Sequence, residues 1–164
     1  MAELLKVDWV EEIRQRQQNE AASNERAALR GDLLNALAKA EGLQRFEGIL
    51  KEIRLQAIAA SEIGVGCQLT NVARDTDKEA GNHVFRIDVR SMSGRVASAY
   101  ADLSYTEGDT HIRCFPSNTE SFEIAFQLNV ERKLTLLGPG GEIKSDAKAA
   151  KLVLFPLVKI LTAE

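Results

Sequence analysis

Three alanines alternate along one predicted strand, and this pattern constrains the fold more than any other feature of the chain. Ala97, Ala99 and Ala101 lie on one face of a predicted strand at residues 96–105, because successive side chains of a strand point to opposite sides. The preceding predicted strand, at 83–90, carries large apolar residues on the matching face. A column of small side chains beside a column of large ones predicts a groove in which a helix lies. The alternative is that the groove stays open as a pocket for an apolar ligand.

The apolar residues between positions 67 and 137 recur with a period of two, which is typical of strands buried on one face. Short segments rich in Gly, Asn, Asp, Ser and Pro separate the apolar runs, and none is long enough to hold a crossover helix. Successive strands without a crossover pair in antiparallel fashion. The sequence therefore predicts an antiparallel meander, with strands at 67–74, 83–90, 96–105, 110–115, 121–130 and 134–137.

The lengths of the predicted turns keep one face of this sheet apolar. A three-residue loop at 92–94 pairs Ile87 with Ala99. The two-residue loop of the next hairpin pairs Leu103 with Ile112. A shift of one residue would move every side chain of a strand to the other face. Because the predicted turn lengths keep the apolar residues of successive strands on the same side, they predict a single apolar face. That face contains Phe85, Ile87, Val89, Ala97, Ala99, Ala101, Leu103, Ile112, Cys114, Phe122, Ile124 and Phe126.

The first third of the chain contains no proline, and its apolar residues have helical spacing. Gly42 separates two apolar stripes, and glycine commonly ends a helix. We therefore expect a helical hairpin at residues 27–62. Near the C-terminus, Ser145 is suited to cap a helix at 145–162. Pro156 predicts a kink in that helix or its division into two short helices.

Together these elements predict a single α+β domain that spans residues 1–164. In this arrangement the helical hairpin and the C-terminal helix pack on one face of a sheet of five or six strands. The sheet occupies residues 63–138.

A different kind of segment precedes the hairpin. Residues 14–26 are almost entirely polar, so this stretch can bury little surface and predicts an extended helical arm over residues 1–26. The arm begins with an apolar cluster that includes Trp9, the only tryptophan of the chain, and Ile13. One interpretation is that the cluster folds back on its own domain. The other is that Trp9 and Ile13 dock on a neighbouring subunit or partner, since tryptophan often anchors interfaces. The cluster consists of Leu4, Leu5, Val7, Trp9, Val10 and Ile13.

The polar side chains of the sheet form two predicted cross-strand rows. The first row contains Arg86, Tyr100 and Phe115, an aromatic pair with a cation within reach. Such a pair either stabilises the sheet or forms a patch that binds a partner. The second row is interpreted as a structural charge ladder, formed by Asp102, Arg113 and Glu123.

Signals for catalysis or cofactor binding are weak. The chain has two histidines, two cysteines 47 residues apart and no motif for a nucleotide, metal or activated nucleophile. We therefore expect no catalytic residue, no metal site and no cofactor. The net charge of −3 argues against nucleic acid as a partner. No apolar run is long enough to insert into a membrane. The N-terminal residues lack the pattern of a signal peptide, so we expect a cytoplasmic protein.

Two functions are compatible with these features. The first is a non-enzymatic interaction or assembly module, a homodimer or homo-oligomer, whose partner is another protein or a second copy. Its partner-binding residues would be Trp9, Ile13, Arg86, Tyr100 and Phe115. The second is a small-molecule binding protein or enzyme with a pocket between the curved sheet and the helices. In that case the alanine column at 97, 99 and 101 would line the pocket.

Overall fold

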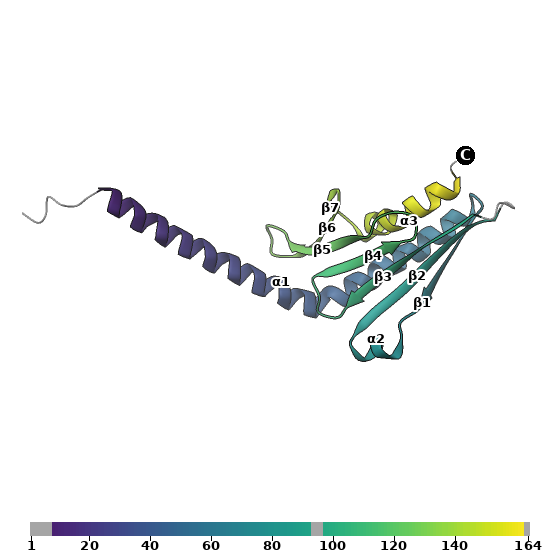
Figure 1. Cartoon of the computed structure of the whole chain (residues 1–164), viewed down its shortest axis with the longest axis horizontal. Coiled ribbons are helices and arrows are strands. Elements are labelled where there is room, and N and C mark those ends of the chain that lie inside the picture. Colours follow the sequence, from purple (N-terminus) through teal and green to yellow (C-terminus); the bar gives the residue numbers. More distant parts are fainter. Residues whose placement is uncertain (1–7, 93–96, 163–164) are drawn as a thin grey trace, which may run out of the picture. The chain divides into compact units, whose positions relative to one another are not determined.

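The computed structural model describes residues 8–92 and 97–162, and it has the α+β architecture that the sequence predicts (Figure 1). The chain divides into two compact units at Leu33. The first unit contributes the N-terminal part of α1, and the second contains the rest of α1 and every other element. In chain order the elements are α1 (Asp8–Ser61), β1 (Val65–Asn71), α2 (Asp75–Glu79), β2 (Asn82–Ser91), β3 (Ser98–Thr106), β4 (His111–Pro116), β5 (Phe122–Leu128), β6 (Leu134–Gly138), β7 (Gly141–Ile143) and α3 (Asp146–Thr162).

The strands form one antiparallel sheet in sequential order, which confirms the predicted meander. The sheet has seven strands, more than the five or six expected, because β7 extends it beyond residue 138 to Ile143. A three-residue strand is too short to show a period of two, so the sequence pattern could not identify it. A turn between Gly138 and Gly141 joins β6 to this strand.

The side chains predicted to share the apolar face do so, but the registers of two strand pairs differ from the predicted ones by two residues. Ile87 lies opposite Ala101 rather than Ala99. In the next pair Leu103 lies opposite Cys114, again two residues from the predicted partner. An even shift leaves every side chain on its predicted face.

The predicted pairing of Ile112 with Ile124 is confirmed between β4 and β5. Of the three-residue loop predicted at 92–94, residues 93 and 94 lie outside the described residues, within the gap at 93–96. The observed registers need longer connections than the predicted ones.

The predicted helical hairpin at 27–62 is wrong, because α1 runs without a break from Asp8 to Ser61. Gly42 lies buried in the middle of α1, against the sheet. A Cβ added at this position would overlap the hydroxyl of Tyr105 and would lie 3.3 Å from the ring of Phe126. Glycine is therefore needed here for close packing of the helix on the sheet, and not to end a helix.

Two helices cover one face of the sheet, which we call the covered face. Phe46 of α1 packs its ring against Phe85 and Tyr105, at centroid distances of 6.1 and 5.4 Å. Helix α3 packs against β2 and β3, where the alanine column lies. Ala99 and Ala101 are buried in the resulting core.

Helix α3 begins as predicted, since the N–H of Lys148 donates a hydrogen bond to Oγ of Ser145 over 3.2 Å. Pro156 lies inside α3 and does not divide it into two helices. In the described part of the chain, no helix has both the length and the apolar character that crossing a bilayer requires.

Candidate interaction surface on the open face of the sheet

Neither α1 nor α3 lies over the opposite face of the sheet, which we call the open face (Figure 1). Its side chains alternate with those of the core along each strand. Tyr100 lies between the buried Ala99 and Ala101, yet it is 40% exposed. Phe115 on β4 is 46% exposed. Two large aromatic side chains are thus in contact with solvent on the open face.

Arg86 connects the polar and the aromatic groups of this face. Its Nε donates a hydrogen bond to Oδ1 of Asp102 over 2.8 Å, and its second terminal nitrogen donates to Oδ2 over 2.9 Å. The guanidinium carbon also lies 4.4 Å from the centre of the Tyr100 ring. The hydrogen bonds and the charge of Asp102 raise the pKa of Arg86, so the guanidinium remains a cation.

Phe115 completes this group, because it is the cross-strand partner of Asp102. Arg86, Tyr100, Asp102 and Phe115 form what we call the aromatic patch. The sequence predicts that Arg86, Tyr100 and Phe115 lie together on this face. It places all three in one cross-strand row, whereas Tyr100 lies opposite Asp88 in the structure. It assigns Asp102 to Arg113 instead, which is wrong because the two-residue shift sets Asp102 opposite Arg86.

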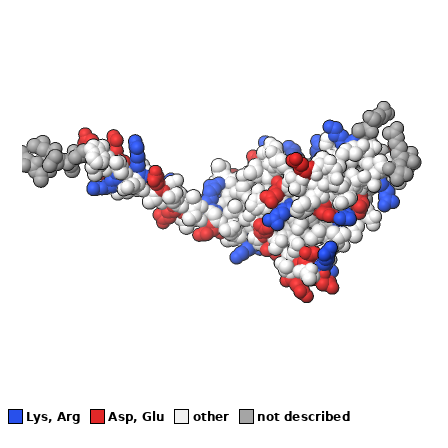
Figure 2. All heavy atoms as spheres, in the orientation of Figure 1, with Lys and Arg blue, Asp and Glu red and all other residues white. Residues whose placement is uncertain are grey.

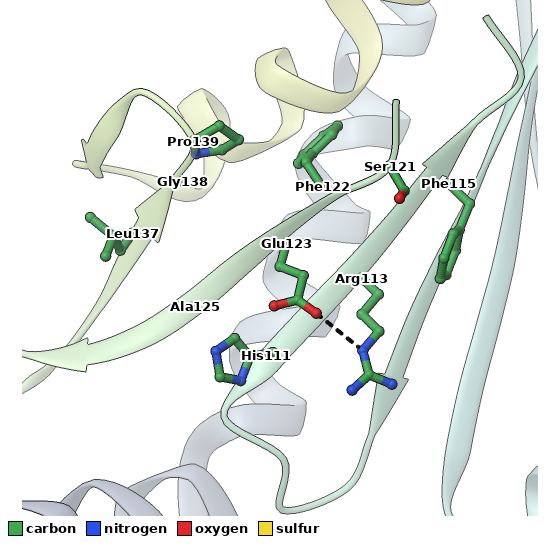
Figure 3. A pocket seen from close by; sticks show the side chains of 10 residues that line it. All are labelled: His111, Arg113, Phe115, Ser121, Phe122, Glu123, Ala125, Leu137, Gly138 and Pro139. Atoms are coloured by element: carbon green, nitrogen blue, oxygen red, sulfur yellow. Dashed lines mark hydrogen bonds and ion pairs between the residues drawn. The ribbon is translucent and has the colours of Figure 1, made fainter. Parts of the chain in front are cut away.

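The predicted ion pair of Arg113 with Glu123 is present beside the patch, at 3.4 Å between Nε and Oε1. This pair lies in a pocket of about 590 Å³ over β4, β5 and β6 (Figure 3). Phe115 lines one end of the pocket, and Leu137 lies across it. His111, which also lines the pocket, has its Nδ1 2.9 Å from the hydroxyl of Thr110. The pocket therefore extends the aromatic patch with both apolar and charged groups.

One histidine–carboxylate pair in the structure is not predicted from the sequence. Nε2 of His83 lies 2.9 Å from Oε1 of Glu107, and both side chains are partly exposed. The two residues are far apart in the sequence, so only the β2–β3 register could have revealed their contact. Among the described residues, no group of three or more His, Cys, Asp or Glu side chains is arranged to hold a metal ion.

The two thiols are buried to different degrees. Burial raises the pKa of Cys114 to about 12, and it also raises the pKa of the half-buried Cys67. A raised pKa keeps a thiol protonated and therefore poorly nucleophilic. Neither cysteine has the environment of an activated nucleophile.

The alanine column lies on the covered face, away from the aromatic patch. Ala101 is fully buried, Ala99 is 6% exposed, and Ala97 is partly buried against the same core. Since α3 packs on β3 here, a helix lies in the groove that the sequence also allows as a ligand pocket.

The first unit has an apolar group of its own at the start of α1. Trp9, Val10 and Ile13 are 62%, 39% and 45% exposed. Their spacing of three and four residues places them on one side of the helix. Residues 8–26 are helical, as predicted for the arm. The remaining members of the predicted apolar cluster, Leu4, Leu5 and Val7, lie outside the described residues.

The surface in Figure 2 carries acidic and basic side chains interspersed, without a broad basic area on the face shown. The aromatic patch has the same balance, since one arginine is paired with one aspartate. Comparison of the chain with family models, with curated proteins and with solved structures found no match, so the geometry of these residues is the basis for any functional conclusion.

Proposed function

We propose that this protein is a non-enzymatic, cytoplasmic interaction module that assembles with further copies of itself. One observation carries the proposal: the aromatic patch is exposed on a sheet face that neither α1 nor α3 covers. Tyrosine, phenylalanine and arginine are enriched where protein surfaces meet, and buried aromatic residues supply much of the binding free energy there.

Three of the four side chains of the patch, those of Arg86, Tyr100 and Asp102, contact one another before any partner binds. The two hydrogen bonds to Asp102 fix the guanidinium of Arg86, and that group lies over the ring of Tyr100. A surface whose side chains are already ordered loses less conformational entropy on binding. The paired charges also give the patch no net charge, so two patches can approach each other without electrostatic repulsion.

The exposed side of the first turns of α1 supports the same function. Trp9, Val10 and Ile13 form the apolar side of an otherwise polar helical segment. Such a helix can bind an apolar groove through side chains spaced three and four residues apart. We propose that Trp9 and Ile13 contribute to assembly in this way.

Self-association of the full chain tests this proposal. The double variant Tyr100→Ser, Phe115→Ser removes both aromatic rings from the patch, and we expect weaker association in sedimentation velocity and light scattering. Phe155→Ser is the matched control, because Phe155 is another exposed aromatic residue, on α3, with Lys151 5.6 Å from its ring. Deletion of residues 1–13 tests the contribution of Trp9 and Ile13.

A strict monomer at all accessible concentrations, unchanged by the deletion, would contradict the proposal. So would association that the patch variant and the deletion leave as strong as it is in the control.

A further inference from the structure

The first strand of the sheet has an edge with no partner among the described residues. Strand β1 pairs only with β2. The N–H of Met92 donates to the carbonyl of Gly64, and the N–H of Val72 donates to that of Val84. Because hydrogen-bonded pairs alternate along an antiparallel ladder, the even-numbered residues of β1 bond to β2. The N–H and C=O groups of residues 65, 67, 69 and 71 therefore point away from the sheet.

This edge lacks the features that usually prevent strands from pairing. Between Val65 and Asn71 there is no charged residue and no proline, and such residues are what natural proteins place on exposed edges. The opposite edge differs. Strand β7 has only three residues, carries the exposed Glu142, and follows a turn that contains Pro139.

Apolar side chains of α1 flank the open edge. A hollow of about 530 Å³ lies between β1 and the last turns of α1, and Ala57, Ile58, Cys67 and Leu69 are among the residues that line it. Ile58 is 68% exposed and Leu55 is 51% exposed. The apolar side chain of Ile58 therefore lies in solvent beside the open edge.

We propose that β1 pairs antiparallel with β1 of a second copy, about a twofold axis that is perpendicular to the sheet and passes midway between the two Gln68 residues. The inference rests on the proposed self-assembly and assigns one contact between copies to this edge. Full overlap of the strand with itself places Cys67 opposite Leu69 of the second copy, and Val65 opposite Asn71 of the second copy. The outward-pointing backbone groups then pair with one another, and no like charges face each other along the two strands.

The same axis brings the apolar flanks of the two copies together. Rotation about an axis perpendicular to a sheet leaves each face on its own side, so the helices of both copies lie on the covered face. Ile58 and the half-buried Leu69 then lie near the junction, where a second copy removes their exposed surface from water. Backbone pairing provides the geometry of this contact, and the apolar flank adds affinity.

Charge substitutions at Gln68 test the inference. This side chain is exposed on the open face, so a charge there leaves the core of the monomer intact. In the proposed register it faces its own counterpart at a Cα distance of about 4.5 Å. Gln68→Lys alone and Gln68→Glu alone each place like charges together, and each should weaken self-association by about tenfold or more. An equimolar mixture of the two variants should restore association as a heterodimer.

Two controls accompany the charge variants. Glu142→Lys changes the charge of the opposite edge and should leave association unchanged. Oxidation of Gln68→Cys should produce covalent dimers, because the facing Cα distance suits a disulfide. Thr70→Cys should not, since its partner in this register is Gly66 of the second copy.

The outcomes separate this inference from the proposed function. If the wild-type chain does not self-associate at all, both fail. If Gln68 variants associate like wild type while Tyr100→Ser, Phe115→Ser does not, only the edge inference is overturned. Covalent dimers from Gln68→Cys, together with restoration in the mixed sample, would support it even where one charged variant folds poorly.

Discussion

The two faces of the sheet are formed by the same strands, yet they have opposite properties. On β3, Ala99 and Ala101 are buried beneath α3 while Tyr100 between them is exposed. On β4, Cys114 is 1% exposed and its neighbour Phe115 is 46% exposed. The covered face therefore carries the stability of the fold. The open face is free of that constraint, and its aromatic residues are available to a partner.

The largest expected effect comes from making the same substitution on each face. Phe46 is fully buried against the covered face, with its ring near those of Phe85 and Tyr105. Phe46→Ala should lower the free energy of unfolding by about 3–5 kcal/mol, because it leaves a cavity in the core. Phe115→Ala on the open face should cost less than about 1 kcal/mol.

Urea denaturation of both variants, at a concentration where the wild type is monomeric, measures this difference. Similar losses for the two variants would mean that the open face is also a stabilising surface. In that case the assignment of stability to one face and of binding to the other would be wrong.

A smaller effect tests how closely α1 approaches the covered face. Gly42→Ala adds a methyl group where the hydroxyl of Tyr105 already lies, so overpacking should cost about 1–3 kcal/mol. Gly31, in the same helix, has no neighbouring atom within 4 Å of an added Cβ. Gly31→Ala should instead stabilise the helix by up to about 1 kcal/mol, because alanine has the higher helix propensity.

Thermal unfolding of these two variants gives opposite changes in Tm if the packing argument holds. A stabilising Gly42→Ala would show that Tyr105 can move aside at little cost.

The sequence was sufficient to assign residues to faces, and the reason is physical. Burial on one side imposes a period of two, and an even shift of register does not disturb it. The pattern therefore identified the covered face and placed Tyr100 and Phe115 on the other. It could not distinguish pairings that differ by two residues, so the ion pair of Arg86 with Asp102 appeared only in the structure.

Features that depend on contacts between distant segments were not predictable. Gly42 has the same sequence signature whether it ends a helix or admits a close neighbour, and only the position of Tyr105 decides between them. The sequence shows that β1 lacks charged residues and proline. This lack matters for pairing only because β1 lies at the edge of the sheet, which the structure alone reveals. The exposed side chain of Ile58 likewise suggests a contact surface only once the structure shows that it lies beside that edge.

The last prediction concerns the pH dependence of stability, which reflects how completely the core on the covered face excludes water. Burial raises the pKa of the Cys114 thiol from 9.0 to about 12, so the folded protein holds this proton more tightly than the unfolded chain does. Its contribution to stability is complete below pH 9 and is lost as the pH rises toward 12. Over that interval the free energy of unfolding should fall by about 1.4 kcal/mol per pH unit from this group alone.

Comparison with Cys114→Ala isolates the contribution of the thiol, because the buried Tyr105 also has a raised pKa and is present in both proteins. The variant is less stable at neutral pH, since it leaves a small cavity, but its stability should fall less steeply above pH 9. Parallel slopes for the two proteins would show that water reaches Cys114 and hydrates its thiolate. Water would then reach the covered face more readily than the packing of α1 and α3 implies. The two faces would differ only in how much water reaches them.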